Sequence, residues 1–235
     1  MSAEQIVEEL RALGTEPYRK VLRNHGAPEP LFGVKIEELK KIQKRIKKDY
    51  LLAKELYDTG IYDAMYLAGL IADDAQMTPS DLDHWAANSG CQGIAEYTVA
   101  WVAAESPHGW ERAHAWIESS DERIASSGWA TLGGLMALEA DADLDLAALE
   151  RLLDRVRDTI HSQPNRVRYT MNGFVIAVGA YVVALTDRAL ATAAALGTVT
   201  VDMGGTACKV PAAADYIEKV RQRGSLGKKK KTVKC

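Results

Sequence analysis

The chain has 235 residues, of which 47% are apolar, 26% are charged and 7% are aromatic. This is the composition of an ordinary globular protein, and it excludes collagen-like, disordered and disulfide-scaffold proteins. The longest apolar stretch, residues 171–185, is shorter than the roughly 20 residues that a membrane-spanning helix needs. The N-terminus lacks a signal-peptide pattern, and the three widely spaced cysteines favour reduced thiols. We therefore expect a cytoplasmic monomer without a membrane partner.

The net charge of −3 conceals a strong asymmetry along the chain. Residues 1–61 carry a net charge of +2, residues 62–160 carry −13, and residues 161–235 carry +8. The basic side chains are concentrated in residues 35–48 and in a lysine-rich tail over residues 228–234. Basic ends around an acidic centre favour a polyanionic partner that touches the protein at two places. Solvated helix faces are the alternative explanation.

Helical periodicity dominates the chain from its first residues. Ser2 and Gln5 form a capping-box pattern before a helix that Gly14 can close. Residues 36–48 predict an amphipathic helix with an apolar stripe beneath a basic outer face. Thr78 and Pro79 mark the N-cap and first turn of another helix. Further helices are predicted over residues 51–56, 61–72, 94–104, 110–118, 122–138, 146–160, 167–185, 187–196 and 212–223.

Only residues 198–202 alternate in the manner of an extended segment. About a dozen helices with short connections and so little strand predict an all-α protein. Such helix pairs are typical of an α-solenoid of the HEAT or armadillo type, and a compact helical bundle is the alternative. We expect a helical-repeat domain over residues 1–197. A C-terminal extension over residues 198–235 would contain the extended segment, a last helix and the basic tail.

Most catalytic motifs are absent from the sequence. There is no HExxH zinc motif, no nucleophile-elbow pattern and no glycine-rich dinucleotide fingerprint. The five histidines show no metal-ligand spacing with one another or with the cysteines. The sequence therefore predicts neither a metal nor a cofactor.

Two polar residues lie inside apolar predicted helices and need an explanation. A buried carboxylate such as Glu96 is costly unless it is paired or used, although a solvent-facing position at a helix end is the alternative. Asn172 is expected to bond to backbone, and Arg166 and Arg168 near it form a candidate phosphate clamp. Five tryptophans crowd into residues 85–129, where most are expected to pack between helices and one or two to line a groove.

A resemblance to a known family is carried by four stretches of the chain, residues 31–42, 47–56, 63–68 and 116–120. The sequence resembles the bacterial DNA alkylation repair family, the AlkD-like HEAT-like-repeat proteins, over about residues 30–185. The resemblance implies a C-shaped all-α solenoid whose concave face holds duplex DNA. It also implies excision of alkylated purines in a metal-free cleft that contains tryptophans, an acid and an arginine.

The family's tryptophan and acid fit this sequence in two registers. One register places them on Trp85 and Ser89 and loses the acid, whereas the other places them on Gln92 and Glu96 and keeps it. The second register fits the helix better, so we predict Glu96 as the catalytic carboxylate and retain Trp85 as the alternative candidate. A carboxylate can stabilise the oxocarbenium ion that develops during excision. The arginine of the family has only Arg123 near its place. The predicted cleft residues are Gln92, Trp129, Tyr169, Asn172 and Phe174.

Two functions follow from these patterns. The first is a DNA-binding repair protein, with or without glycosylase activity, since the catalytic positions differ from the family pattern. The second is a non-enzymatic helical-repeat scaffold that binds protein or nucleic acid. A continuous basic concave groove would favour the first. The predicted DNA-binding residues are Lys35, Lys40, Lys44, Lys47, Lys48, Arg166, Arg168, Lys228, Lys229 and Lys230.

Overall fold

The structure is a computed structural model that describes residues 1–234. Over this range the chain forms thirteen α-helices, several short 3₁₀ turns and one π-helical turn, η2 (Ile94–Val99), and no strand. The all-α prediction is confirmed. The helices are α1 (Ala3–Leu13), α2 (Glu16–Asn24), α3 (Ile36–Ile46), α4 (Tyr50–Asp58), α5 (Tyr62–Ile71), α6 (Pro79–Ala87), α7 (Ala100–Glu105), α8 (Gly109–Trp116), α9 (Glu122–Leu138), α10 (Leu146–Thr159), α11 (Asn165–Tyr181), α12 (Thr186–Leu196) and α13 (Ala213–Gln222).

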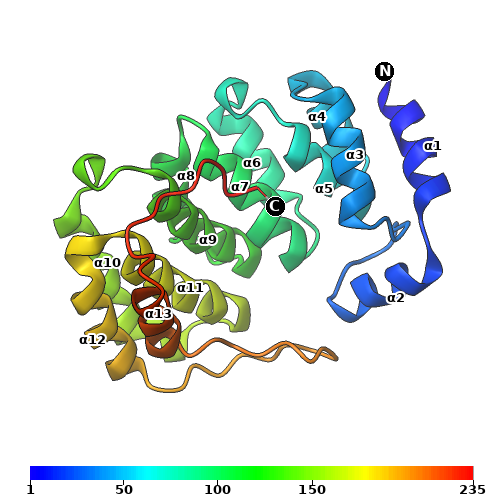
Figure 1. Ribbon diagram of the computed structural model, residues 1–235. Coiled ribbons are helices and arrows are strands. Elements are labelled where there is room, and N and C mark those ends of the chain that lie inside the picture. Colours follow the sequence, from blue (N-terminus) through cyan, green and yellow to red (C-terminus); the bar gives the residue numbers. More distant parts are fainter. Residues whose placement is uncertain (235) are drawn as a thin grey trace.

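The helices stack in two layers along a curved row (Figure 1). Helix α5, the π turn η2 with α7, helix α9 and helix α11 contact one another in this order and form the central layer. Helices α4, α6, α8, α10 and α12 pack against this layer and form the outer layer. Each pair of helices, one from each layer, buries its apolar side chains mainly against the neighbouring pairs, which is the packing of an α-solenoid.

Local sequence signals explain where several helices begin. The Ser2 hydroxyl and the Gln5 side chain form the predicted capping box of α1. Thr78 and Asp81 form a second capping box at the start of α6, with Pro79 in its first turn. Helix α2 was not predicted, because its apolar residues Tyr18, Val21 and Leu22 span little more than one turn and none of them is buried.

A buried carboxylate joins two stretches that carry the family resemblance. Asp63 in α5 is 1% exposed, and its two oxygens accept hydrogen bonds from the backbone N–H groups of Phe32, Gly33 and Val34 at 2.6–3.3 Å. Three charge-assisted hydrogen bonds compensate the burial of this carboxylate. They also fix the loop that leads into α3.

The segment after α12 is extended but does not pair as a strand. Val199 and Val201 are buried in the same apolar core as α9, α11 and α13, so the alternation in the sequence reflects one-sided burial. The Asn165 side chain bonds both the N–H and the carbonyl of Asp202, at 2.7 and 2.9 Å. The Asn172 amide donates to the Pro211 carbonyl at 3.0 Å. The C-terminal segment thus shares a core with the repeats, and the division at residue 197 stays a prediction.

Residues 225–234, which we call the tail, run across the C-terminal ends of the central-layer helices (Figure 1). The Gly227 N–H donates to the Ala180 carbonyl of α11 at 2.9 Å, and the Lys230 N–H donates to the Ala137 carbonyl of α9 at 2.7 Å. Further on, the Val233 N–H donates to the Glu105 carboxylate of α7 at 2.8 Å. Because helix C-termini carry partial negative charge, a lysine-rich tail is well suited to this path.

Candidate functional site

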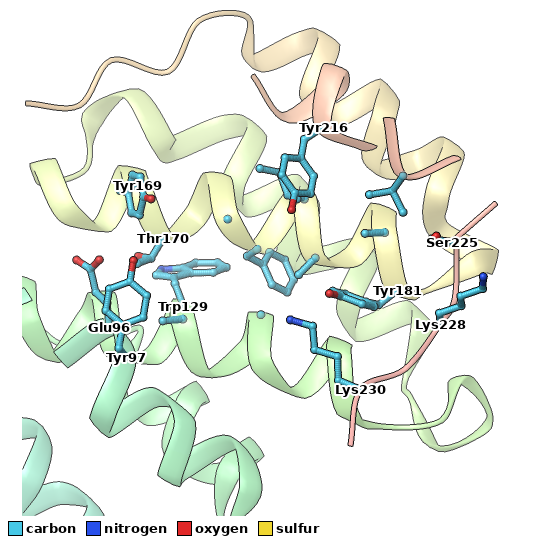
Figure 2. A pocket seen from close by; sticks show the side chains of 18 residues that line it. Glu96, Tyr97, Trp129, Tyr169, Thr170, Tyr181, Tyr216, Ser225, Lys228 and Lys230 are labelled. Carbon is cyan, nitrogen blue, oxygen red and sulfur yellow. The ribbon is translucent and has the colours of Figure 1, made fainter. Parts of the chain in front are cut away.

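A cavity of about 530 Å³ lies between α9 and α11, and α13 and the tail close one end of it (Figure 2). We call it the α9–α11 groove. Small side chains keep it open. A Cβ atom added at Gly173 would meet nothing within 4 Å, and one at Gly133 would meet only Ala177, at 3.7 Å. These two glycines and three alanines on the facing helices, Ala130, Ala177 and Ala180, line the groove.

Aromatic side chains surround the groove. Trp129 and Phe174 line it with their ring centroids 5.4 Å apart, and both are buried. Tyr97 and Tyr216 are 45% and 49% exposed. Figure 2 shows tyrosines at both ends and along the sides, so flat apolar faces with polar edges are available to a ligand. The four groove tyrosines are Tyr97, Tyr169, Tyr181 and Tyr216.

Glu96 and Arg166 form a two-pronged ion pair at one end of the groove. The Arg166 Nε atom lies 2.7 Å from Glu96 Oε1, and its Nη2 atom lies 2.5 Å from Glu96 Oε2. The side chains are only 2% (Glu96) and 17% (Arg166) exposed. The guanidinium also lies over the Tyr169 ring, 4.4 Å from its centroid, and the Arg166 N–H donates to Glu122. Arg166 is therefore held by partners on η2, α9 and its own helix α11.

The backbone explains how Glu96 reaches this place. Glu96 and Tyr97 lie in the π turn η2, which runs directly into α7. A single π turn inside a helix is uncommon and often occurs at functional sites. Against α5 the turn packs closely, because a Cβ atom at Gly69 would lie 2.6 Å from the Thr98 methyl group.

Burial and the ion pair act in opposite directions on Glu96. Burial raises the pKa of this carboxyl group, and the Arg166 guanidinium partly offsets the rise. The carboxylate is thus held by a cation of the protein itself. An acid that stabilises an oxocarbenium ion must instead present its charge to the substrate. The residues predicted separately as catalytic acid and phosphate ligand are bonded to each other.

At the other end of the groove the tail contributes lysines. Lys228 and Lys230 line the groove, and the Lys230 ammonium lies 5.8 Å from the Tyr181 ring centroid (Figure 2). Lys229 points the other way, toward Asp141 at 2.8 Å and the Met136 carbonyl at 2.9 Å. The DNA contact predicted for Lys229 stays a prediction, and its ammonium is paired within the protein.

Several predicted site residues lie elsewhere in the molecule. Trp85 is 1% exposed and stacks on Tyr57 with ring centroids 4.1 Å apart, so it belongs to the N-terminal core. The Gln92 amide bonds the His25 carbonyl at the end of α2, outside the groove. Asn172 is buried, and its side-chain amide donates to a backbone carbonyl, as expected from the sequence. The Arg168 guanidinium contacts Asn165 at 3.4 Å.

The predicted lysines of α3 divide into two groups. Lys35 pairs with Glu37 at 3.6 Å, and Lys40 forms no ion pair within residues 1–234. Lys44, Lys47 and Lys48 line a second cavity together with the tail.

Sequence reasoning missed Tyr97, Tyr181 and Tyr216, because it favoured tryptophans. A signal for the groove was present in α11. Tyr169, Gly173, Ile176, Ala177 and Ala180 recur at helical spacing, and a stripe of one aromatic and several small residues is unusual for a tightly packed core. No pattern in the sequence indicated that α13 packs beside α11 and contributes to the same groove.

The described part of the chain brings no three His, Cys, Asp or Glu side chains together as metal ligands. Within residues 1–234 no single helix is long and apolar enough to cross a membrane. In that range only α11 and residues 183–196 taken together have the required length and apolar composition, and the chain bends by 114° between them.

Comparison with known proteins agrees with this architecture. The family model described as DNA alkylation repair enzyme matches residues 6–203. The chain belongs to the DNA alkylation repair family. This confirms the resemblance found in the sequence.

Relatives of this DNA alkylation repair family member cover nearly its whole length. Uncharacterized proteins of Listeria innocua and Listeria monocytogenes are each 35% identical over 225 residues, which is 94% of this chain and 97% of theirs. One solved structure superimposes with a TM-score of 0.93 at 37% identity, over 100% of both chains. That structure is described as a new family of proteins related to the HEAT-like repeat DNA glycosylases with affinity for branched DNA structures. The solenoid fold is thereby confirmed.

Proposed function

We propose that the protein binds branched DNA through the α9–α11 groove and does not excise bases. The observation that carries this proposal is the Glu96–Arg166 ion pair beside an aromatic groove. The family relationship and the branched-DNA affinity of the similar solved structure support it.

The groove chemistry suits nucleotides that have left the base stack. Tyrosine faces stack on any base, and such stacking contributes about 1–3 kcal/mol per base. Lys228 and Lys230 at the same groove add positive charge for phosphates. Nucleotides at a branch that are already unpaired cost the least to extrude, so they are the preferred ligand.

The ion pair argues against base excision. In the excision mechanism that the resemblance implies, a carboxylate that faces the sugar stabilises its positive charge. Here the charge of Glu96 is offset by Arg166, whose Nε and Nη2 atoms bind its two oxygens. A site of this kind can hold a nucleotide but lacks the free negative charge that the reaction uses.

The test combines binding with chemistry on the full chain. Fluorescence anisotropy with a splayed-arm fork and with a linear duplex of equal length measures the preference at one fixed salt concentration. In parallel, a duplex that contains 7-methylguanine is incubated with the protein and scored for abasic sites. We expect tighter binding to the fork and no abasic sites above the protein-free control. Equal affinity for both DNAs would refute the branch preference, and abasic sites that increase with protein would establish the glycosylase instead.

A further inference from the structure

A second cavity, of about 570 Å³, is formed where the tail meets the C-terminal end of α3. The C-terminal end of α3 contributes Lys44 and Lys47, and the tail contributes Lys231 and Lys234. We call it the lysine cavity. It is also lined by Gln43, Lys48, Leu70, Glu105 and Thr232.

The acidic groups beside this cavity already have partners. Asp74, whose side chain is 3% exposed, lies 3.2 Å from Lys48 Nζ and 2.6 Å from Lys234 Nζ. Glu105 accepts hydrogen bonds from the Val233 N–H and the Thr232 hydroxyl. Both carboxylates hold the tail in place: Asp74 is paired with two lysines, whereas Glu105 accepts from uncharged donors.

Three cations at the cavity form no ion pair with a described residue, and they outnumber Glu105, the one carboxylate among those residues that lines it. Lys44, Lys47 and Lys231 are exposed and form no ion pair within residues 1–234. Lys47 has a φ of 68°, a conformation that side chains other than glycine rarely adopt. Such a conformation persists where the surrounding structure holds it, and it places Lys47 at the cavity rather than along α3. Like charges gathered around one hollow create a local positive potential that attracts anions.

The tail links the lysine cavity to the α9–α11 groove. Lys230 lines the groove, and its neighbour Lys231 lines the cavity. Consecutive Cα atoms lie about 3.8 Å apart, so the tail passes from one site to the other within a single residue. A nucleic acid strand that leaves the groove along the tail therefore meets Lys231 next.

We propose that the lysine cavity is a phosphate-binding site that takes the backbone of a second DNA arm when the groove holds the branch. The proposal rests on the proposed function for the source of the phosphates. Lysine ammonium groups bind phosphates as point charges without reading sequence. One contact at the branch and another on an arm would favour branched over linear DNA.

The test uses a charge-matched pair of full-length triple variants. Lys44→Gln, Lys47→Gln and Lys231→Gln together remove the free cations of the cavity. Lys20→Gln, Lys209→Gln and Lys219→Gln remove the same charge from exposed positions that form no ion pair within residues 1–234. The salt dependence of fork binding is measured for both. We expect the cavity variant to lose about two to three units of the slope of log K against log salt, and the control to lose less than about one. Equal slopes for the two variants would overturn the proposal while leaving fork binding intact.

A second readout locates the contact. Lysine acetylation followed by mass spectrometry is compared with and without fork, and slower acetylation of Lys44, Lys47 and Lys231 but not of Lys20 is expected. If the wild type binds no DNA, the proposed function fails, and the cavity is then probed with tripolyphosphate. Protection of the same three lysines by tripolyphosphate would support a phosphate site with a different source of phosphate. No protection by either probe would overturn it.

Discussion

At the residue scale the account depends on one pair, Glu96 and Arg166. The two residues are 70 positions apart and could not be joined from sequence, because no periodicity links η2 to α11. The sequence did show that a carboxylate inside an apolar helix needs a partner or a role. The structure supplies the partner, and it is the arginine that was assigned to phosphate binding.

Neutralising Glu96 is expected to strengthen DNA binding. Glu96→Gln removes the charge that holds Arg166, so the guanidinium becomes available to a phosphate. One added phosphate contact steepens the slope of log K against log salt by about 0.9. Glu150→Gln is the control, since Glu150 is an exposed residue of α10 and loses the same charge. Identical fork affinity and slope in the two variants would show that Arg166 is not released.

Removing Arg166 is expected to make stability depend on pH. Burial raises the pKa of Glu96 above its value in the unfolded chain, and Arg166 offsets part of that rise. A raised pKa favours the protonated form in the folded state. The stabilising contribution of Glu96 to the free energy of unfolding is therefore complete below the unfolded pKa of about 4.3. It is lost as pH rises through the folded pKa. In Arg166→Met the rise is larger, since nothing offsets it.

Urea unfolding of Arg166→Met at several pH values checks this sign. We expect a free energy of unfolding about 3–5 kcal/mol below wild type near pH 8, and a smaller deficit near pH 4.5. The double variant with Glu96→Gln removes the titrating group and should lose the extra pH dependence. A deficit that is the same at both pH values would instead reflect only lost packing against Tyr169.

At the scale of elements, helices with an apolar stripe or a capping box could be predicted, and those without could not. Helix α9 was predicted at residues 122–138, the bounds that the structure gives. Helix α2 was missed because it buries nothing, and α11 ends four residues earlier than predicted because the chain turns at Val182. The groove itself could not be foreseen, since it depends on α9, α11, α13 and the tail lying together.

The tail is expected to stabilise the solenoid. It bonds the ends of α11, α9, α7 and α5 through backbone and side-chain groups. Each hydrogen bond contributes about 0.5–1.5 kcal/mol, so truncation after Gly224 should lower the free energy of unfolding by about 2–4 kcal/mol. Urea unfolding measures this difference, and far-ultraviolet circular dichroism should show that the helices remain. Unchanged stability would mean that the docked tail contributes little to the fold.

At the scale of the whole molecule, the charge asymmetry has an internal explanation in addition to a partner. Acidic residues of the central segment bind basic residues of the C-terminal segment, as in Asp141 with Lys229 and Asp74 with Lys234. The sequence pattern correctly indicated that opposite charges were segregated. It could not show which charges are used inside the fold and which, such as Lys44 and Lys47, remain for a ligand.

The most direct test of the account is to fill the α9–α11 groove. Gly173→Leu places a side chain where no atom lies within 4 Å of the added Cβ, so the helix should keep its packing. Ala194→Leu, at an exposed position of α12 in the outer layer, is the matched control. Anisotropy with the splayed-arm fork should show an affinity about tenfold or more weaker for Gly173→Leu, a loss of about 1.4 kcal/mol, and a wild-type value for Ala194→Leu. Wild-type fork affinity in a folded Gly173→Leu protein would contradict the claim that DNA enters this groove.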